Sequence, residues 1–383
     1  MSKEELTEVV SKRYFKVKYR KEKSVILDEY CQNTGYNRNY AIAKLKQCWR
    51  TDGEGKERKR RPRKYGYDLN EPLLIAWRTA NHICVERFQP FLPELLGKLE
   101  QNGYLQIGGE QKKKLIEMSI STIKRRLRSI KEKHVSKGLS ATKPGYLLKR
   151  EIPIQTLCWD TKKAGYCEID LVAHCGGSLS GHFIFTLQFV DIKTTWTERK
   201  AVMGKGQNGV FTAIKDIRKI LPFDLLGIDS DNGGEFINDQ LLRYCQKENI
   251  AFTRSRPYMS KDNAHIEQKN YTTVRKVLGY DRFDTEQHLQ LINDLYDNEL
   301  RLYINFFQPT MKLKEKKRIG SKYVRKYDTA KTPYQRVMES NEVSNTKKGK
   351  LKALYDSLDP VQLKQAIDRK VLRIIHLSKN SDY

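Results

Sequence analysis

The sequence lacks the cysteine pattern of a disulfide framework or a zinc ribbon. Its seven cysteines are scattered singly, an odd count without any CxxC pair. It also lacks any apolar run near the roughly 20 residues that a membrane span needs, and the charged start MSKEELTEVV lacks the apolar core of a signal peptide. We therefore expect a cytoplasmic protein that makes no membrane contact.

Acidic residues are scarce relative to basic ones. The chain has 46 Asp and Glu against 73 Lys and Arg, a formal net charge of +27. Such proteins usually bind polyanions, of which nucleic acid is the common one, and the alternative is a ribosome-like or simply very soluble surface. Its 383 residues, 38% of them hydrophobic, suffice for two or three domains with packed cores.

Residues 1–52 are predicted to form a helix-turn-helix DNA-binding domain. KSVILDEYCQ and RNYAIAKLKQCW each place apolar residues on one stripe, and NTGY breaks the pattern between them. Asn37 can cap the second helix, where Arg38 and Lys44 are candidate DNA contacts. The apolar spacing is imperfect, so an ordinary helical hairpin remains the alternative.

Residues 53–70 are predicted to be a basic linker. Six of the seven residues from Arg58 to Lys64 are basic, and like charges this dense keep a segment extended and solvated. Arg60, Arg61 and Arg63 are candidates to lie along phosphates or enter a minor groove. A plain linker is the alternative, and both can hold because the segment joins two modules.

Residues 71–150 are predicted to form a second helical DNA-binding domain. In QKKKLIEMSISTIKRRLRSI, Ser121 is expected to cap a helix that turns Ile123 and Leu127 inward. This orientation leaves a polar face that could meet DNA or simply be solvated: Thr122, Lys124, Arg125, Arg126 and Arg128.

Residues 151–305 change to alternating β-forming runs and amphipathic helices. The order β-β-β-α-β-α-β-α predicts an α/β domain, a mixed five-stranded sheet with helices on both faces and right-handed crossovers. Residues 306–383 are predicted to form a basic and helical C-terminal region. Its helical tail could pack on its own domain or bind a partner helix.

GIDSDNGGEF, residues 227–236, holds three carboxylates directly after an apolar stretch. Acids this close repel one another, so the stretch is either a solvated turn or one part of a metal site. Asp170 lies inside a predicted strand, which is costly unless the acid is paired or binds a metal. Asp231 follows the fourth strand, at the edge where open α/β sheets bind ligands. Glu267 lies on the edge of a late helix and can point at the same crevice.

Asp170, Asp231 and Glu267 could together hold two Mg²⁺ (or Mn²⁺) ions. Such a pair activates an attacking oxygen and stabilises the leaving one in phosphoryl transfer. Two rival acids are interpreted as structural. Asp229 would project to the opposite face from its strand neighbour, and Asp191 would end an edge strand.

The loop TRSRPYMSKD is predicted to border this crevice and anchor phosphates beside the scissile one. A solvated flap is the alternative. The candidate DNA contacts of the loop and the following helix are Arg254, Arg256, Lys261, Lys269 and Arg275.

SDNGGEF, followed after 35 residues by the Glu of DNAHIEQKN, resembles the D-x35-E signature of retroviral integrases and DDE insertion-sequence transposases. EIDLVAH resembles the strand that carries their first Asp. The resemblance covers roughly residues 155–335 and implies an RNase H-like core with Asp170, Asp231 and Glu267 as its catalytic and metal-binding triad. The HHCC zinc module of the retroviral proteins is absent from the sequence.

The resemblance and the basic N-terminal half together predict a DNA transposase. It would bind transposon ends through residues 21–132, hydrolyse a phosphodiester to free a 3′-OH, and join that end to target DNA. We expect it to act as a homo-oligomer on double-stranded DNA, associated with a bacterial nucleoid. The alternatives are a non-catalytic DNA-binding regulator, which has no use for three converging acids, and an RNase H-like nuclease without strand transfer.

Overall fold

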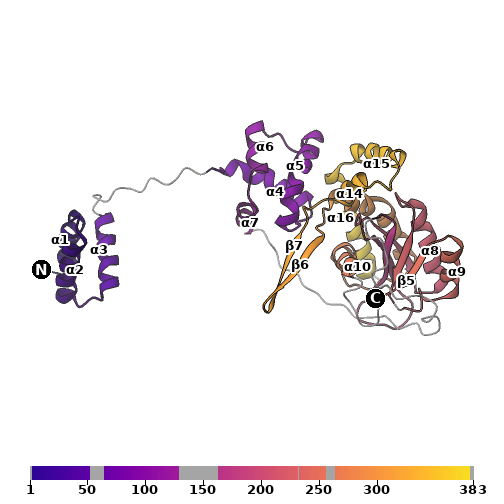
Figure 1. The fold of residues 1–383 in the computed structure, drawn as a ribbon, viewed down its shortest axis with the longest axis horizontal. Coiled ribbons are helices and arrows are strands. Elements are labelled where there is room, and N and C mark those ends of the chain that lie inside the picture. Colours follow the sequence, from indigo (N-terminus) through magenta and orange to yellow (C-terminus); the bar gives the residue numbers. More distant parts are fainter. Residues whose placement is uncertain (1, 52–63, 129–162, 232, 256–263, 380–383) are drawn as a thin grey trace. The chain divides into compact units, whose positions relative to one another are not determined.

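The computed structural model describes residues 2–51, 64–128, 163–231, 233–255 and 264–379 (Figure 1). The chain divides into two compact units, Met1–Lys64 and Tyr65–Tyr383. Among the described residues, no helix is both long enough and apolar enough to cross a bilayer.

The first unit is a bundle of three helices, α1 (Lys3–Lys16), α2 (Arg20–Thr34) and α3 (Arg38–Thr51). Gly35 ends α2 with a φ of 73°, a conformation that favours glycine. Asn37 accepts a hydrogen bond from the backbone N–H of Tyr40 at 2.8 Å and so caps α3, as predicted. Two helices were expected after residue 20 and are present, whereas α1 was not predicted. The buried core consists of Leu27, Tyr30, Ala41 and Leu45.

The second unit begins with a short 3₁₀ turn, η1 (Tyr67–Leu69), and four helices: α4 (Asn70–Thr79), α5 (Val85–Gln101), α6 (Gly109–Ile116) and α7 (Ile120–Leu127). Ile123 and Leu127 of α7 are buried, as predicted. The cap of α7 was predicted two residues too late. Ser119, not Ser121, accepts the hydrogen bond from the backbone of Thr122.

A mixed five-stranded sheet follows, formed by β1 (Tyr166–Ala173), β2 (Ile184–Asp191), β3 (Thr197–Met203), β4 (Gly227–Ser230) and β5 (Ala251–Arg254). Its order is β3-β2-β1-β4-β5. The first three strands form an antiparallel meander, and β1, β4 and β5 are parallel neighbours. The predicted RNase H-like arrangement is confirmed.

Helices cover this sheet and close its edge. α8 (Gln207–Ile220) packs on β2 and β3, and α9 (Asp239–Lys247) packs on β5. The side-chain amide of Asn305 hydrogen-bonds the backbone N–H and C=O of Thr197, both at 2.9 Å. The amide of Asn293 bonds the same two groups of Ala201, at 2.8 and 3.0 Å. These side-chain amides bond backbone groups of β3 as a neighbouring strand would, so the edge strand has fewer unpaired backbone groups that could pair with another chain.

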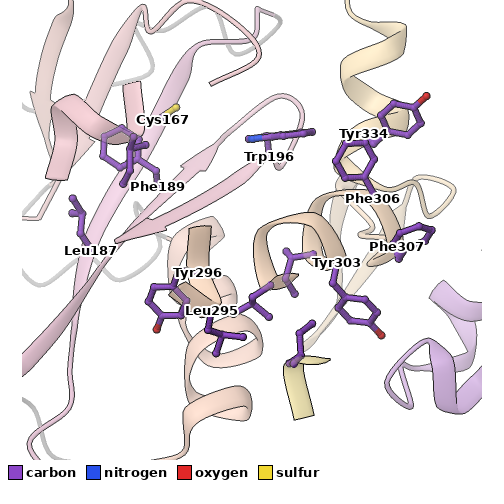
Figure 2. Close-up of a cluster of buried hydrophobic side chains, with 14 of the residues drawn as sticks. Cys167, Leu187, Phe189, Trp196, Leu295, Tyr296, Tyr303, Phe306, Phe307 and Tyr334 are labelled. Atoms are coloured by element: carbon purple, nitrogen blue, oxygen red, sulfur yellow. The ribbon is translucent and has the colours of Figure 1, made fainter. Parts of the chain in front are cut away.

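The helical part of the chain that follows the last strand of the sheet is interrupted at residues 279–285. It comprises α10 (Ala264–Lys269), the π-helix η3 (Asn270–Arg275), α11 (Lys276–Leu278), α12 (Glu286–Leu295), the π-helix η4 (Tyr296–Leu300) and α13 (Arg301–Phe307). α10 packs on β1 and β2, and α13 packs on β3. Figure 2 shows part of the core beside these helices, where Trp196 meets Phe306 edge to face with ring centroids 5.8 Å apart.

The C-terminal part consists of a hairpin, β6 (Leu313–Ile319) and β7 (Lys322–Tyr327), and the helices α14 (Pro333–Glu339), α15 (Asn345–Ser357) and α16 (Pro360–Lys379). α16 packs on α12 and α13, so the helical tail packs on its own domain, which was one of the two predicted alternatives. Lys370 of α16 pairs with Asp294 and Glu299, each at 2.6 Å.

The second unit also joins segments that the sequence analysis treated separately. The phenol of Tyr303 donates to the carbonyl of Thr79 at 2.6 Å, and the ammonium of Lys98 donates to the carbonyl of Tyr355 at 2.8 Å. Helices α4–α7 and the C-terminal region therefore belong to one unit with the sheet. The finer bounds of 71–150, 151–305 and 306–383 stay predictions.

Candidate active site

Asp170 and Asp231 come to the same level on adjacent parallel strands. Ile169 of β1 pairs with Ser230 of β4, and each aspartate is the next residue along its chain. Both side chains are partly exposed, so a solute can reach them. The prediction that the first and fourth strands lie side by side at the sheet centre is confirmed.

Asp170 is held by two hydrogen bonds. One carboxylate oxygen accepts from the backbone N–H of Leu171 at 2.8 Å, and the other accepts from the side-chain amide of Asn270 at 2.6 Å. Burial, and then the negative charge of Asp231, raise the pKa of Asp170 to about 7, although both hydrogen bonds act against this rise. The charge of Glu235 adds to the effect. The neighbouring carboxylates therefore add to the effect of burial, and protonation of Asp170 relieves both.

Asp231 is shaped by the tight turn that follows it. Its carboxylate accepts from the backbone N–H of Gly233 at 2.9 Å. A Cβ on Gly233 would lie 2.7 Å from the Glu235 carboxyl carbon and 2.9 Å from the Asp231 oxygen, so a side chain there would displace these two carboxylates. Burial raises the pKa of Asp231, whereas the Gly233 hydrogen bond and the charge of Lys205 lower it.

Helix α10 is attached to this sheet face at successive turns. The Glu168 carboxylate accepts from the backbone N–H of Ile266 at 2.9 Å, and Asn270 bonds Asp170. One turn further, the amide of Gln188 donates to the Thr273 hydroxyl at 3.0 Å. The helix becomes a π-helix at Asn270, an irregularity found frequently at functional sites.

Glu267 lies between the first two attachments, on the exposed side of α10. Burial raises its pKa, and this is the sole cause resolved. Within the described ranges, no group of three His, Cys, Asp or Glu residues is arranged closely enough to hold a metal ion. The structure thus brings together two of the three predicted acids and places the third on the helix above them.

The chemistry of the acid pair nevertheless suits a hard divalent cation. All the donors are carboxylate oxygens, the ligands that Mg²⁺ and Mn²⁺ prefer. The raised pKa values of Asp170 and Asp231 indicate that a positive charge between them would be stabilising. These two residues are the candidates to hold such an ion, and Glu267 is the candidate to complete its ligands.

The rival acids are engaged in hydrogen bonds that agree with structural roles. Asp229 is fully buried and accepts from the Thr253 hydroxyl at 2.6 Å. Asp191 accepts from the backbone N–H of Gly165 at 2.7 Å and from the N–H and hydroxyl of Thr194, both at 2.6 Å. The expectation that Asp191 ends an edge strand was wrong, because β2 is an interior strand and β3 forms the edge.

Some candidate DNA contacts around α7 bond other residues of the protein, and others are exposed to solvent. Arg126 turns back to Asn70 and to the carbonyl of Tyr65, and Lys124 pairs with Glu86. The Thr122 hydroxyl lies 3.0 Å from that of the capping Ser119. Arg125 and Arg128 are exposed. They are the members of the predicted set best placed to meet a ligand.

In the first unit, Arg38 pairs with Asp28, and Lys44 lines a hollow that it shares with Glu4 and Glu8 of α1. Both residues therefore have acidic neighbours within their own bundle. The other predicted contacts of the linker and the flanking loop, namely Arg60, Arg61, Arg63, Arg256 and Lys261, lie outside the described residues.

Lys269 departs most from its expected position. It is only 7% exposed, so it points into the protein and not at the rim of the crevice. Burial, and then the charges of Arg199, Arg87 and Arg336, lower its pKa to about 7. Arg254 is also buried. Arg275 is partly exposed, and its guanidinium lies 4.8 Å from the centre of the Tyr280 ring.

Four residues of the site were not assigned a role from the sequence. Glu235 was visible as the third carboxylate of GIDSDNGGEF, and Asn270 ends the motif EQKN. Glu168 lies two residues before Asp170, so strand alternation places both on one face. Lys205, whose ammonium is 3.9 Å from Glu235, has no sequence signal.

The strand order and the acid pair define a chain with an RNase H-like, integrase-type core. The chain belongs to the same family as the uncharacterised protein y4rM of Sinorhizobium fredii. The two are 36% identical over 335 residues, 87% of this chain and 94% of that relative. No family model matches the chain.

Two solved structures are similar in part. The HTLV-2 integrase catalytic core domain in complex with magnesium is 14% identical, with a TM-score of 0.29, and the match covers 39% of this chain and 91% of that one. The catalytic core domain of BIV integrase is 15% identical, with a TM-score of 0.30, covering 45% and 91%. Similarities of this size do not strengthen the assignment of the core, which rests on the strand order.

Proposed function

We propose that the protein is a metal-dependent DNA transposase that cleaves a phosphodiester at a transposon end and joins the freed 3′-OH to target DNA. The observation that carries the proposal is the pair Asp170 and Asp231, which share one level of two parallel strands. Burial, and then the neighbouring charge of Asp231, raise the pKa of Asp170 to about 7. Asp231 of this pair is also the first residue of the D-x35-E motif that ends at Glu267.

Each residue of the site has a part in this proposal. Asp170 and Asp231 would hold divalent cations, and Glu267 would complete the ligands from α10. When bound, Mg²⁺ or Mn²⁺ would supply charge stabilisation for the attacking and leaving oxygens. Asn270 keeps Asp170 in one orientation through the 2.6 Å hydrogen bond, so that the ligand is positioned before the cation arrives.

The basic surface would bring the DNA to this site. The formal net charge of +27 favours association with a polyanion. Exposed Arg125 of α7 and Arg128 directly after it, together with the helix-turn-helix bundle α1–α3, are the proposed duplex contacts. Oligomerisation on the two transposon ends is part of the proposal, because both ends must be brought to one target.

Cleavage of a labelled duplex taken from the DNA that flanks the gene tests the proposal. The full chain with Mg²⁺ or Mn²⁺ should nick one strand and then join the new 3′ end to a second duplex. Asp231→Asn should abolish both steps and leave DNA binding intact, because it removes one anionic ligand. The matched control Asp229→Asn, two residues earlier and within β4, should retain activity.

The outcomes separate the alternatives. Cleavage without joining would indicate a nuclease, and binding without cleavage in the unmodified chain would indicate a regulator; either result would overturn the proposal. An inactive Asp229→Asn together with an active Asp231→Asn would show that the second ligand is assigned to the wrong acid.

A further inference from the structure

Among the strands that the structure describes, β6 and β7 pair only with each other and form a ribbon. They make a separate two-stranded sheet, visible in Figure 1 as a long hairpin. Gly320 has a φ of 60° in the two-residue turn between the paired residues Ile319 and Lys322. Leu313–Tyr327 contains seven Lys and Arg and one Glu. Nearly every side chain of the ribbon is exposed.

The pairing register gives the ribbon two different faces. Residues directly opposite in an antiparallel pair share a face, and alternate residues along a strand change face. Lys316 pairs with Arg325, and Arg318 pairs with Tyr323. We call these four residues the cationic face. The opposite face, here the mixed face, comprises Glu315, Lys317, Ile319, Lys322, Val324 and Lys326.

Charge balance distinguishes the two faces. On the mixed face, the Glu315 carboxylate pairs with Lys317 at 2.6 Å and with Lys326 at 3.2 Å. The cationic face contains no acidic residue. Two of its three cations lie over Tyr323: the ammonium of Lys316 is 4.6 Å, and the guanidinium carbon of Arg318 is 6.0 Å, from the ring centre. A flat row of uncompensated cations beside an aromatic ring is complementary to a phosphate backbone and its sugars.

The base of the ribbon is firmly attached to the unit. The backbone N–H of Lys312 donates to the Asp328 carboxylate at 2.6 Å, and Thr310 bridges to Lys331. Arg336 of α14 pairs with Asp328 at 2.9 Å. The charge of Arg336 also acts on Lys269, two residues after Glu267. The ribbon therefore starts close to the helix that carries Glu267 but extends into solvent.

We propose that the cationic face of the β6–β7 ribbon binds duplex DNA, with the ribbon seated in the major groove. That groove is about 12 Å wide and admits a two-stranded ribbon, whose strands lie about 5 Å apart. A two-stranded hairpin is marginal by itself in water, so a partner that covers it also stabilises it. The choice of DNA as the occupant rests on the proposed function.

Two triple variants of the full chain test the proposal with equal loss of charge. The first replaces the cationic face with Lys316→Gln, Arg318→Gln and Arg325→Gln. The matched control replaces the mixed face with Lys317→Gln, Lys322→Gln and Lys326→Gln. Both lower the net charge by three, so long-range attraction changes equally. Only the first removes the contacts that we propose.

Fluorescence anisotropy with a short mixed-sequence DNA duplex, over a range of salt concentrations, is the measurement. The cationic-face variant should bind at least tenfold more weakly than the mixed-face variant. Its slope of log affinity against log salt should be shallower than that of the unmodified chain by about 2.7, because three phosphate contacts release about 0.9 counterion each. The mixed-face variant should keep a slope near that of the unmodified chain.

Equal weakening by both triple variants would overturn the proposal, since it would show a general charge effect. An A-form RNA duplex of the same sequence provides a second check, because its deep and narrow major groove excludes side chains. Equal loss of RNA and DNA affinity in the first variant would also overturn the groove placement. Cleavage of flanking DNA by the unmodified chain reports on the proposed function separately, so each failure can be assigned.

Discussion

Replacing Asp170 with asparagine should raise the free energy of unfolding of the Tyr65–Tyr383 unit above neutral pH in the absence of divalent cations. The substitution keeps the size of the side chain and removes one of the crowded negative charges. It also keeps the hydrogen bond to Asn270. The carbonyl oxygen of Asn270 has no partner and is buried, so a rotation of that amide lets it accept from the new one.

The magnitude follows from the pKa of Asp170, which rises from an ordinary 3.8 to about 7. A difference of about 3 pKa units corresponds to about 4 kcal/mol at most, at 1.36 kcal/mol each. The side chain is partly exposed, so solvent screens part of the repulsion. We therefore expect a gain of about 1–2 kcal/mol.

The sign depends on pH in a defined way. An acid with a raised pKa in the folded state favours folding while it is protonated, and this contribution is lost as pH rises through the folded pKa. For Asp170 the loss falls between about pH 4 and pH 7. The variant and the unmodified chain should therefore be equally stable at pH 4, and the variant should be more stable at pH 8.

Urea unfolding at a series of pH values, in EDTA and followed by tryptophan fluorescence, measures this difference. Mg²⁺ at pH 8 should stabilise the unmodified chain and leave the variant nearly unchanged, because the variant lacks one cation ligand. A variant less stable than the unmodified chain at pH 8 would refute the inference that the charge of Asp170 destabilises the folded unit. A difference in the free energy of unfolding that does not change with pH would refute it too.

The other predictions concern basic residues. The double variant Arg125→Ala and Arg128→Ala should weaken duplex binding and make the slope of log affinity against log salt shallower by about 1.8. Arg126→Ala should leave that slope unchanged. It should lower the free energy of unfolding by about 1 kcal/mol, because Arg126 bonds Asn70 and Tyr65. Lys269→Met should raise the free energy of unfolding by roughly 1–3 kcal/mol below pH 7, since a buried ammonium is removed. The pKa of Lys269 is about 7 in the folded state and 10.5 otherwise, so this gain should shrink in urea titrations as pH rises toward 10.

The sheet and the acid pair could be predicted because their signals are local and contiguous. Strand alternation marks β1 to β3, and the order of elements requires β1 and β4 to be parallel neighbours. Asp170 and Asp231 then fall at one level without any knowledge of side-chain contacts. The distance of Glu267 from that pair could not be derived in the same way, because it depends on how far α10 lies above the sheet.

The buried position of Lys269 could not be predicted, because a helix is assigned its faces on the assumption that polar residues point to solvent. In the structure the face of the helix that meets the sheet carries Ile266, Lys269, Asn270 and Thr273, which recur at the i, i+3, i+4, i+7 spacing of a buried stripe. Three of these four are polar, so the usual assignment of faces leaves Lys269 at the surface. The cap at Ser119 was missed for a simpler reason: MSIST offers two serines, and both precede the apolar residues Ile123 and Leu127.

The polar stripe is explained by the sheet beneath it. Asp170 pairs with Gln188, and Gln188 pairs with Arg199, so one polar row crosses three strands on a single face. An apolar helix over this row would remove the Thr273 partner of Gln188 and one of the two hydrogen bonds to Asp170, at a cost of about 1–3 kcal/mol apiece. Asn270 and Thr273 provide partners for Asp170 and Gln188.

The two ends of this row carry opposite excess charge. At one end the Asp170 and Asp231 carboxylates repel each other, and at the other the terminal nitrogens of Arg199 have no partner and its pKa is lowered to about 10. Neighbouring strands lie about 5 Å apart, so two steps place Arg199 about 10 Å from Asp170. Opposite charges at that distance attract by about 1.7 kcal/mol at an effective dielectric constant near 20. Burial, and then the charge of Asp231, raise the pKa of Asp170 to about 7 even with Arg199 in place. Arg199 therefore moderates the negative charge of the acid pair without neutralising it.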